Sequence, residues 1–151
     1  MRWYVGSDHG GVVLRDQLVE CLRGNGHEVE SVKGPATSSE SCDYPDIALE
    51  VCRLVVADEG SAALLVCGTG QGMAMSANKV PGIRAALVSD VFSAHMAREH
   101  NDANVLCLGQ RVLGPGLATD LLSAFAGATF EGGRHARRVG KLEAIAGEGR
   151  S

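Results

Sequence analysis

The sequence predicts a three-layer, doubly wound α/β domain with a five-stranded parallel sheet, and three observations lead to this prediction. Short apolar segments that suit strands alternate with longer segments whose apolar residues recur at helical spacing. Residues 62–66 are almost continuously apolar, as is typical of a parallel strand covered on both faces. Glycine-rich loops follow two of the predicted strands. Alternation of this kind implies βαβ units, whose crossovers are nearly always right-handed.

The elements can be assigned in order along the chain. The predicted strands are residues 3–5, 27–32, 62–66, 85–88 and 105–108. The predicted helices are residues 12–22, 45–58, a short one ending near 78, 91–98, 114–126 and 134–146, and we expect the tail after 146 to fray. Pro45 suits a first helical turn and Asp90 suits a helix N-cap. The length of 151 residues fits a single domain.

The composition excludes several classes of partner. The formal net charge is -4 with acidic and basic residues interspersed, so we expect neither nucleic acid nor an anionic membrane to bind. No apolar stretch approaches the roughly 20 residues that span a bilayer, and the N-terminal residues do not resemble a signal peptide. The five cysteines follow no disulfide framework and no CxxC spacing. We therefore expect a soluble, cytoplasmic protein.

Ligands of doubly wound sheets bind outside the carboxyl ends of the strands. Four clusters of polar or reactive residues follow predicted strands or lie near them, and we expect all four at or near this edge. They are residues 7–11, 67–72, 100–102 and 134–138. Together the clusters supply a thiol, an imidazole, backbone donors and a pair of arginines that could bind phosphate, but no convincing set of metal ligands.

Cys67 ends the third predicted strand and precedes a loop with glycines at positions 68, 70 and 72. Glycines let the backbone bend sharply and bring its N–H groups close to a ligand, while the next helix directs its positive dipole end to the same point. Such a loop favours an anion or a developing oxyanion, although a plain tight turn fits the same pattern. Cys67 is either a thiol activated near a helix start or an inert buried cysteine. The spacing matches neither the dinucleotide fingerprint nor a Walker loop, and we interpret the other cysteines as structural.

The other clusters allow two interpretations each. Asp8 and His9 follow the first strand, where they can contact a ligand, but Asp8 can also simply cap the first helix. His100 can transfer protons near neutral pH or merely complement the end of a helix dipole. Arg134 and Arg138 lie one i,i+4 step apart at the start of the last helix, which favours a phosphate site over a solvated basic face.

Five motifs, in order, resemble the ribose-5-phosphate isomerase B family, which also contains galactose-6-phosphate isomerase subunits. The motifs are GSDHGG, DYPDIA, CGTGQG, HNDANVLCLG and EGGRHARRV, and they extend over nearly the whole chain. The resemblance implies a Rossmann-like domain and a homodimer, or a dimer of such dimers, with active sites built across the interface. It also implies interconversion of D-ribose 5-phosphate and D-ribulose 5-phosphate without a metal or any other cofactor.

The resemblance further implies a role for each matching residue. Cys67 matches the base that moves a proton between C2 and C1 through a cis-enediolate, and no acid lies between Gly68 and Ala77 to replace it. His100 matches the residue that opens the sugar ring. Thr69 and the glycine loop match the group that holds the enediolate oxygens. The matches that bind the substrate or its phosphate are Asp8, His9, Gly68, Gly70, Gln71, Gly72, Asn101, Arg111, Arg134, His135 and Arg138.

Several alternatives stay open. The loop at residues 32–37 lacks the Asp-x-Gly-Thr motif found in many family members. The substrate could therefore instead be allose 6-phosphate, galactose 6-phosphate, a tetrulose phosphate or a free aldose. A cysteine phosphatase would need an arginine shortly after the glycine loop, where Met73 and Met75 stand. A non-catalytic nucleotide-binding module would explain the glycines but not the joint presence of Cys67, His100 and the paired arginines.

Overall fold

The computed structural model describes residues 1–148, and of Glu148 only the backbone. The elements are β1 (Arg2–Ser7), the 3-10 turn η1 (His9–Gly11), α1 (Val12–Gly24), β2 (Glu28–Lys33), α2 (Tyr44–Ala57), β3 (Ala62–Cys67), α3 (Gln71–Ala77), β4 (Ala85–Leu87), α4 (Val91–Asn101), β5 (Val105–Gly109), α5 (Pro115–Gly127) and α6 (Arg134–Glu148). They follow the predicted order, and α6 continues to Glu148, past the predicted end at 146. The rest of the tail that we expected to fray lies outside the described residues.

Five parallel strands form one sheet in the order β2-β1-β3-β5-β4, which confirms the predicted fold class. The chain moves outward from β1 to β2 and then returns past β1 to β3. The loops after β1 and β3 therefore open onto opposite faces of the sheet at neighbouring positions. Doubly wound folds bind their ligands at such a switch point.

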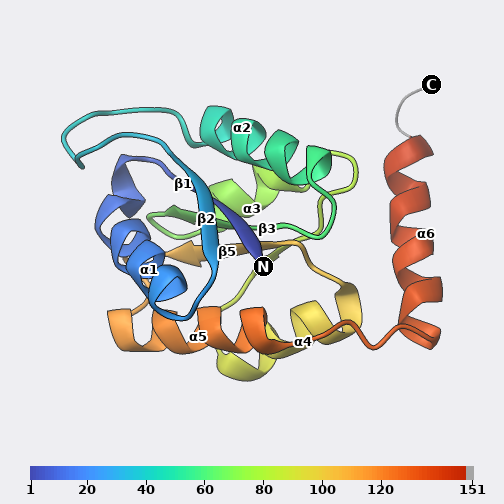
Figure 1. The fold of residues 1–151 in the computed structure, drawn as a ribbon. Helices are drawn as coiled ribbons and strands as arrows, with labels where there is room; N and C mark the ends of the chain where they lie inside the picture. The colour runs from blue at the N-terminus through green and yellow to red at the C-terminus, as the bar shows by residue number, and fades with distance from the viewer. Residues whose placement is uncertain (149–151) are drawn as a thin grey trace.

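Helices cover both faces of the sheet (Figure 1). Buried side chains of α1, α4 and α5 form a core on one face, and those of α2 and α3 form a second core on the other. Within β3, Leu64 and Val66 belong to the first core, whereas Leu65 and Cys67 belong to the second. Cys67 therefore faces the layer of α2 and α3, because strand side chains alternate. None of the helices in the described chain is long and apolar enough to cross a membrane.

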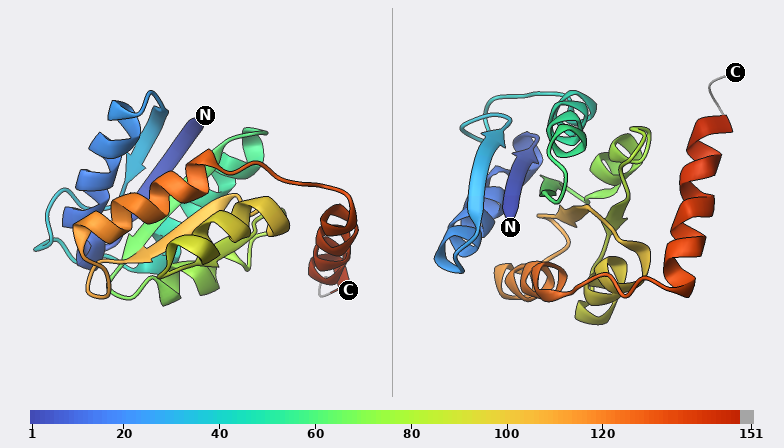
Figure 2. Two further views of the ribbon diagram at one scale, coloured as in Figure 1. Left: turned by 90° about the horizontal axis from the view of Figure 1, so that it is seen from below. Right: turned by 45° about the vertical axis from the view of Figure 1, so that its right-hand side comes forward.

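The last helix, α6, stands apart from these layers (Figure 2). Its first turn lies against the end of α4, and Glu143 further along forms an ion pair with Arg84 at 2.6 Å. Two of its apolar side chains, Leu142 and Ile145, are 52% and 70% exposed. The helix thus presents an apolar side that the described part of the chain leaves largely uncovered.

Candidate active site

Cys67 ends β3 at the carboxyl edge of the sheet, where only 4% of the residue is exposed. Its Sγ accepts a hydrogen bond from the backbone N–H of Gly70 at 3.1 Å. This donor belongs to the loop that turns from β3 into α3. The structure therefore brings the thiol and the glycine loop into direct contact.

Gly70 makes this turn possible. Its φ of 78° lies in the left-handed region, and a Cβ at this position would come within 2.6 Å of Leu87 Cδ1. Any side chain here would displace the loop. The next N–H, that of Gln71, donates to Thr69 Oγ1 at 3.3 Å. Two successive N–H groups are thus directed at the Cys67 and Thr69 side chains.

Asp8 and His9 lie beside the same loop. The Oδ1 atom of the buried Asp8 accepts a hydrogen bond from the N–H of Gly10 at 2.8 Å, so Asp8 caps η1. His9 Nδ1 accepts from the N–H of Cys42 at 3.4 Å. Gly10 packs against the glycine loop, since a Cβ on it would lie 3.2 Å from the nitrogen of Gly68. Asp8 therefore caps the 3-10 turn and not α1 itself, whose N-cap is Gly11. The turn lies against the glycine loop that follows Cys67.

Arg111 and Tyr44 complete this half of the site. Arg111 follows β5, its N–H donates to the Gly68 carbonyl at 2.9 Å, and a Cβ on Gly68 would lie 3.6 Å from its Cδ. The exposed ring of Tyr44 packs on Gly72, where a Cβ would come within 2.7 Å of the ring. Sequence reasoning did not select Tyr44, although the DYPDIA motif contains it, because no local pattern links it to the glycine loop.

His100 and Asn101 end α4 at the opposite edge of the sheet. This helix starts after β4 at the carboxyl edge and runs back, so its end precedes β5. The first residue of β5, Val105, pairs with Ala63 near the start of β3. The expectation that all four clusters gather at the carboxyl edge is therefore wrong for residues 100–102 and for the start of α6. The reason is topological, because a segment that leads into a parallel strand lies at the amino end of that strand.

The ring of His100 stacks on the ring of His135, the second residue of α6. The ring centroids are 4.1 Å apart and the planes are 8° from parallel. His135 is only 5% exposed. The Oε2 atom of Glu131 lies 3.1 Å from His135 Nε2 and 3.7 Å from His100 Nε2. Sequence reasoning gave Glu131 no role in the site, because its contact with His100 joins segments distant in the chain.

Arg134 and Arg138 lie on α6 next to this cluster. The Nε atom of Arg134 donates to His135 Nε2 at 3.4 Å. Arg138 lines a groove of ≈ 710 Å³ between α6 and the sheet domain, together with His100, Asn101 and His135. The predicted imidazole and phosphate-binding residues therefore form a second cluster of their own.

His100, Glu131 and His135 are also a set of described residues whose ligand atoms all lie within 4.8 Å of one another. Two features weaken the interpretation of this set as a metal site. The stacked rings are nearly parallel, so their in-plane lone pairs do not converge on one tetrahedral centre. The guanidinium of Arg134, 3.4 Å from His135 Nε2, repels a cation. Metal-free chemistry stays our prediction.

Three other cysteines are poor candidates for a reactive thiol. Burial raises the pKa of Cys52 to about 12 and raises the pKa of Cys107 well above its ordinary value. Burial is also the main cause of the raised pKa of Cys42. Such thiols stay protonated near neutral pH, which agrees with the structural role predicted for them.

Known proteins resemble this chain over nearly its whole length. A family model described as Ribose/Galactose Isomerase matches residues 4–142. The ribose-5-phosphate isomerase B of Escherichia coli (strain K12) is 44% identical over 93% of each chain. The D-erythrulose-4-phosphate isomerase of Pectobacterium atrosepticum is 38% identical over 91% of this chain and 90% of its own. The structure of ribose-5-phosphate isomerase B from Clostridium thermocellum has a TM-score of 0.94 at 46% identity and covers 98% of this chain and 99% of its own.

These similarities make the chain an isomerase built on an α/β fold. More specifically, it belongs to the ribose/galactose isomerase family. The resemblance carried by the five sequence motifs is thereby confirmed.

Proposed function

We propose that this isomerase interconverts D-ribose 5-phosphate and D-ribulose 5-phosphate through a cis-enediolate. The observation that carries the proposal is the contact of Cys67 Sγ with the Gly70 N–H at 3.1 Å, at the edge where Asp8, His9 and Arg111 also lie. The likeness to the ribose-5-phosphate isomerase B of Escherichia coli supports the choice of substrate.

Cys67 serves as the base. It takes the proton from C2 of the open-chain aldose and delivers it to C1, while an enediolate carries the electrons in between. The hydroxyl proton of O2 moves to O1 in the same reaction, so the C1 carbonyl becomes a hydroxyl and C2 becomes the carbonyl. A carbon acid beside a carbonyl is weak unless its oxyanion is stabilised, and one prearranged donor is typically worth roughly 10²–10³ in rate. The hydroxyl of Thr69 and N–H groups of the glycine loop supply such donors, apart from the N–H groups of Gly70 and Gln71, which donate to Cys67 and Thr69. No acidic residue occurs between Gly68 and Ala77 to take over from the thiol.

The second cluster handles the ring and the phosphate. His100 opens the sugar ring by proton transfer, and Asn101 contacts the substrate next to it. Arg134 and Arg138 bind the phosphate with forked guanidinium groups that match its geometry. Because the phosphate is far from the reacting carbons, its binding energy serves to position C1 and C2 at the base.

The two clusters meet only in a homodimer. Cys67 and Ala63 lie in register with Gly109 and Val105, and this stretch of β3 alone spans roughly 13 Å at about 3.3 Å per residue. A sugar at Cys67 is therefore out of reach of His100 in the same chain, since proton transfer needs hydrogen-bond distance or one intervening water. Cys67 of one chain works with the partner's His100, which is the shared site that the family resemblance implies.

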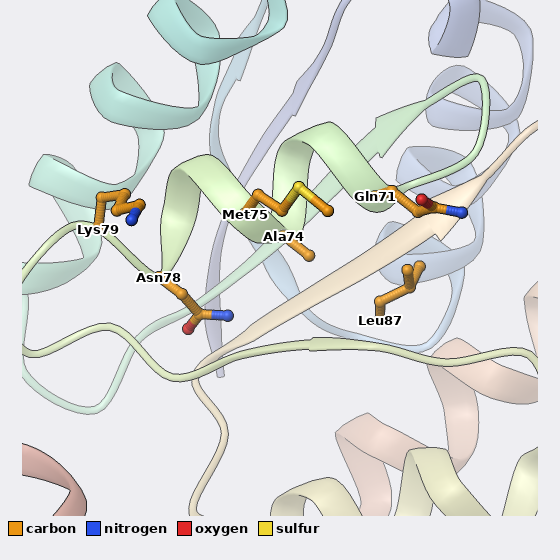
Figure 3. A pocket seen from close by; sticks show the side chains of 6 residues that line it. All are labelled: Gln71, Ala74, Met75, Asn78, Lys79 and Leu87. Carbon is orange, nitrogen blue, oxygen red and sulfur yellow. The ribbon is translucent and has the colours of Figure 1, made fainter.

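Two surfaces that carry exposed apolar side chains are suited to this dimer. One is a hollow of ≈ 470 Å³ along α3, whose lining includes Met75 of α3 and Leu87 of β4 (Figure 3). It lies beside β4, an edge strand of the sheet, and Phe92 at the start of α4 is also exposed. The other is the apolar side of α6 with Leu142 and Ile145. Contiguous exposed apolar surface is typical of protein interfaces.

A different sugar phosphate is the second candidate substrate. The relative from Pectobacterium atrosepticum is named for a four-carbon ketose phosphate. Relatives of similar identity thus carry different substrate names, so similarity alone does not choose the sugar. We therefore propose ribose 5-phosphate as the substrate. We also propose that the reaction needs no cofactor and that the protein is cytoplasmic.

The most informative experiment compares wild type, Cys67→Ala and His100→Ala on a panel of aldose phosphates and free aldoses without added metal. We expect ribose 5-phosphate to be the best substrate and Cys67→Ala to lose about 10²–10⁴ in kcat, the usual contribution of a positioned base. Cys21→Ser is the matched control, because this cysteine lies on α1, which contributes no residue to either cluster. Full activity of Cys67→Ala would refute the thiol base, and an inactive wild type would refute the proposed substrates.

A further inference from the structure

The geometry points to Glu131 and His135 as positioning residues for His100, an inference that rests on the proposed ring-opening role of His100. Neither residue touches the reacting atoms in this scheme. His135 fixes the plane of the His100 ring, and the carboxylate of Glu131 stabilises the protonated form of that ring.

His135 is placed to hold the His100 ring rather than to bind a phosphate. Its buried ring covers one face of the His100 imidazole at 4.1 Å and 8° from parallel. The backbone is fixed at the start of α6, where the N–H of His135 donates to the Gly132 carbonyl at 3.0 Å. Rotation of the His100 ring about its last side-chain torsion, which is intrinsically soft, would break this stack. The stack therefore selects one ring orientation.

Glu131 approaches the same pair from the segment that precedes α6. Its N–H donates to the Glu99 carbonyl at 2.9 Å, which ties this segment to the last turn of α4, one residue before His100. Its Oε2 lies 3.1 Å from His135 Nε2 and 3.7 Å from His100 Nε2, so one carboxylate faces both rings. The carboxylate of Glu99 pairs instead with His95. Glu131 is thus the acid that serves His100.

Ring opening explains why His100 needs such a partner. His100 removes the proton of the anomeric hydroxyl while the C1–O4 bond of the furanose breaks and the C1 carbonyl forms. It then gives the same proton to O4, so the imidazole returns to its starting state. Between the two transfers His100 is an imidazolium ion. A carboxylate 3.7 Å from its Nε2 stabilises this ion by its charge, as the acid of a catalytic triad does for its histidine.

The test separates ring opening from proton transfer at carbon. D-Ribose 5-phosphate closes into a furanose, whereas D-ribulose 5-phosphate cannot, because its C5 oxygen is esterified. Isomerisation of ribose 5-phosphate therefore needs both steps, whereas deuterium incorporation from solvent at C1 of ribulose 5-phosphate needs only the carbon step. The variants are Glu131→Gln and His135→Leu. The matched control is Glu99→Gln, which removes a carboxylate that faces another histidine of the same helix.

We expect Glu131→Gln and His135→Leu to lower kcat on ribose 5-phosphate about 10-fold to 100-fold, a part of the about 10²–10⁴ that general acid-base catalysis contributes. Their KM and their rates of deuterium incorporation should stay within about twofold of wild type, because phosphate binding and the Cys67 step are untouched. His135→Phe keeps a flat ring and should recover most of what His135→Leu loses.

Three results would overturn the inference. The first is that Glu131→Gln and His135→Leu have the same kcat as Glu99→Gln. The second is that their deuterium incorporation falls in parallel with their isomerisation of ribose 5-phosphate. The third is that a chelator abolishes the wild-type activity, since the cluster would then hold a metal. Absence of deuterium incorporation by wild type would contradict the proposed function instead. Should His135→Leu fail to fold, Glu131→Gln still decides, since Glu131 has a 55% exposed side chain. In that variant the ¹⁵N resonances of the His100 ring must differ from those of wild type.

Discussion

Cys67 and His100 lie at opposite ends of the strands of one sheet, Cys67 at the carboxyl end and His100 at the amino end. Cys67 is the last residue of β3 and pairs with Gly109. His100 lies at the end of α4, and α4 leads into β5, whose first residue, Val105, pairs with Ala63 near the start of β3. A thiol base and a ring-opening imidazole that act on one sugar must therefore come from two chains. If they act together, catalysis requires the dimer.

The start of α6 is expected to bind the phosphate of the substrate. Replacing Arg134 or Arg138 by Gln should raise KM for ribose 5-phosphate about 10-fold or more, because charge-assisted hydrogen bonds to the phosphate are lost. Turnover of unphosphorylated ribose, if measurable, should change much less. Steady-state kinetics on the two sugars check this prediction.

Arg137→Gln provides the matched control for these variants. Arg137 is exposed on the same helix and does not line the groove. Its loss removes the same charge, so KM should stay close to that of wild type. Equal increases in KM for all three arginine variants would contradict a defined phosphate clamp, since a general loss of positive charge would then explain the effect.

A buried arginine joins the end of β1 to the segment that follows β2. The Nη1 atom of Arg15 donates to Ser7 Oγ at 3.1 Å and to the Pro35 carbonyl at 2.8 Å. Arg15→Met should lower the free energy of unfolding by about 2 kcal/mol, because the carbonyl loses its partner. Arg23→Met, whose partner Glu20 is 74% exposed, should change it by less than about 0.5 kcal/mol. Urea unfolding at pH 7 measures both, and similar losses for the two variants would count against this role.

Cys52 makes the fold sensitive to alkaline pH. Burial raises its pKa from 9.0 to about 12, so the unfolded chain loses this proton before the folded chain does. The resulting stabilisation is complete below pH 9.0 and is lost as the pH rises towards about 12. The loss approaches about 1.4 kcal/mol per pH unit for one proton. The free energy of unfolding of wild type should therefore fall more steeply over this range than that of Cys52→Ala. Parallel curves from urea titrations at stepped pH would show that the thiol has no such effect.

Local sequence patterns were enough to predict the sheet and the first half of the site. The apolar run at residues 62–66 is buried throughout β3, as expected for a strand covered on both faces. Asp90 caps α4, where its Oδ1 accepts from the N–H of Ser93 at 2.7 Å. Cys67 and the glycine loop belong to one short stretch, so their contact follows from the turn itself.

The second half could not be placed from such patterns, because its contacts join segments that are distant along the chain. Glu131 reaches His100 only because the segment before α6 is tied to the end of α4. Another contact of this kind, the ion pair between Arg84 and Glu143, joins α6 to the segment before β4. The direction of α4 would have predicted the edge at which His100 lies, whereas the motifs by themselves did not.

We propose that Cys67 of one chain and the partner's His100 form one active site. Mixing two variants that are each impaired tests this claim most directly. When Cys67→Ala and His100→Ala chains are refolded together, a mixed dimer has one site in which both residues are intact and one in which both are lost. Each variant alone has no intact site.

Random pairing of equal amounts makes half of the dimers mixed, so the mixture should show about a quarter of the wild-type activity on ribose 5-phosphate. Native mass spectrometry establishes that mixed dimers have formed. Recovery of activity to this level is the result predicted here. A mixture that contains mixed dimers but is no more active than the separate variants would contradict the shared active site.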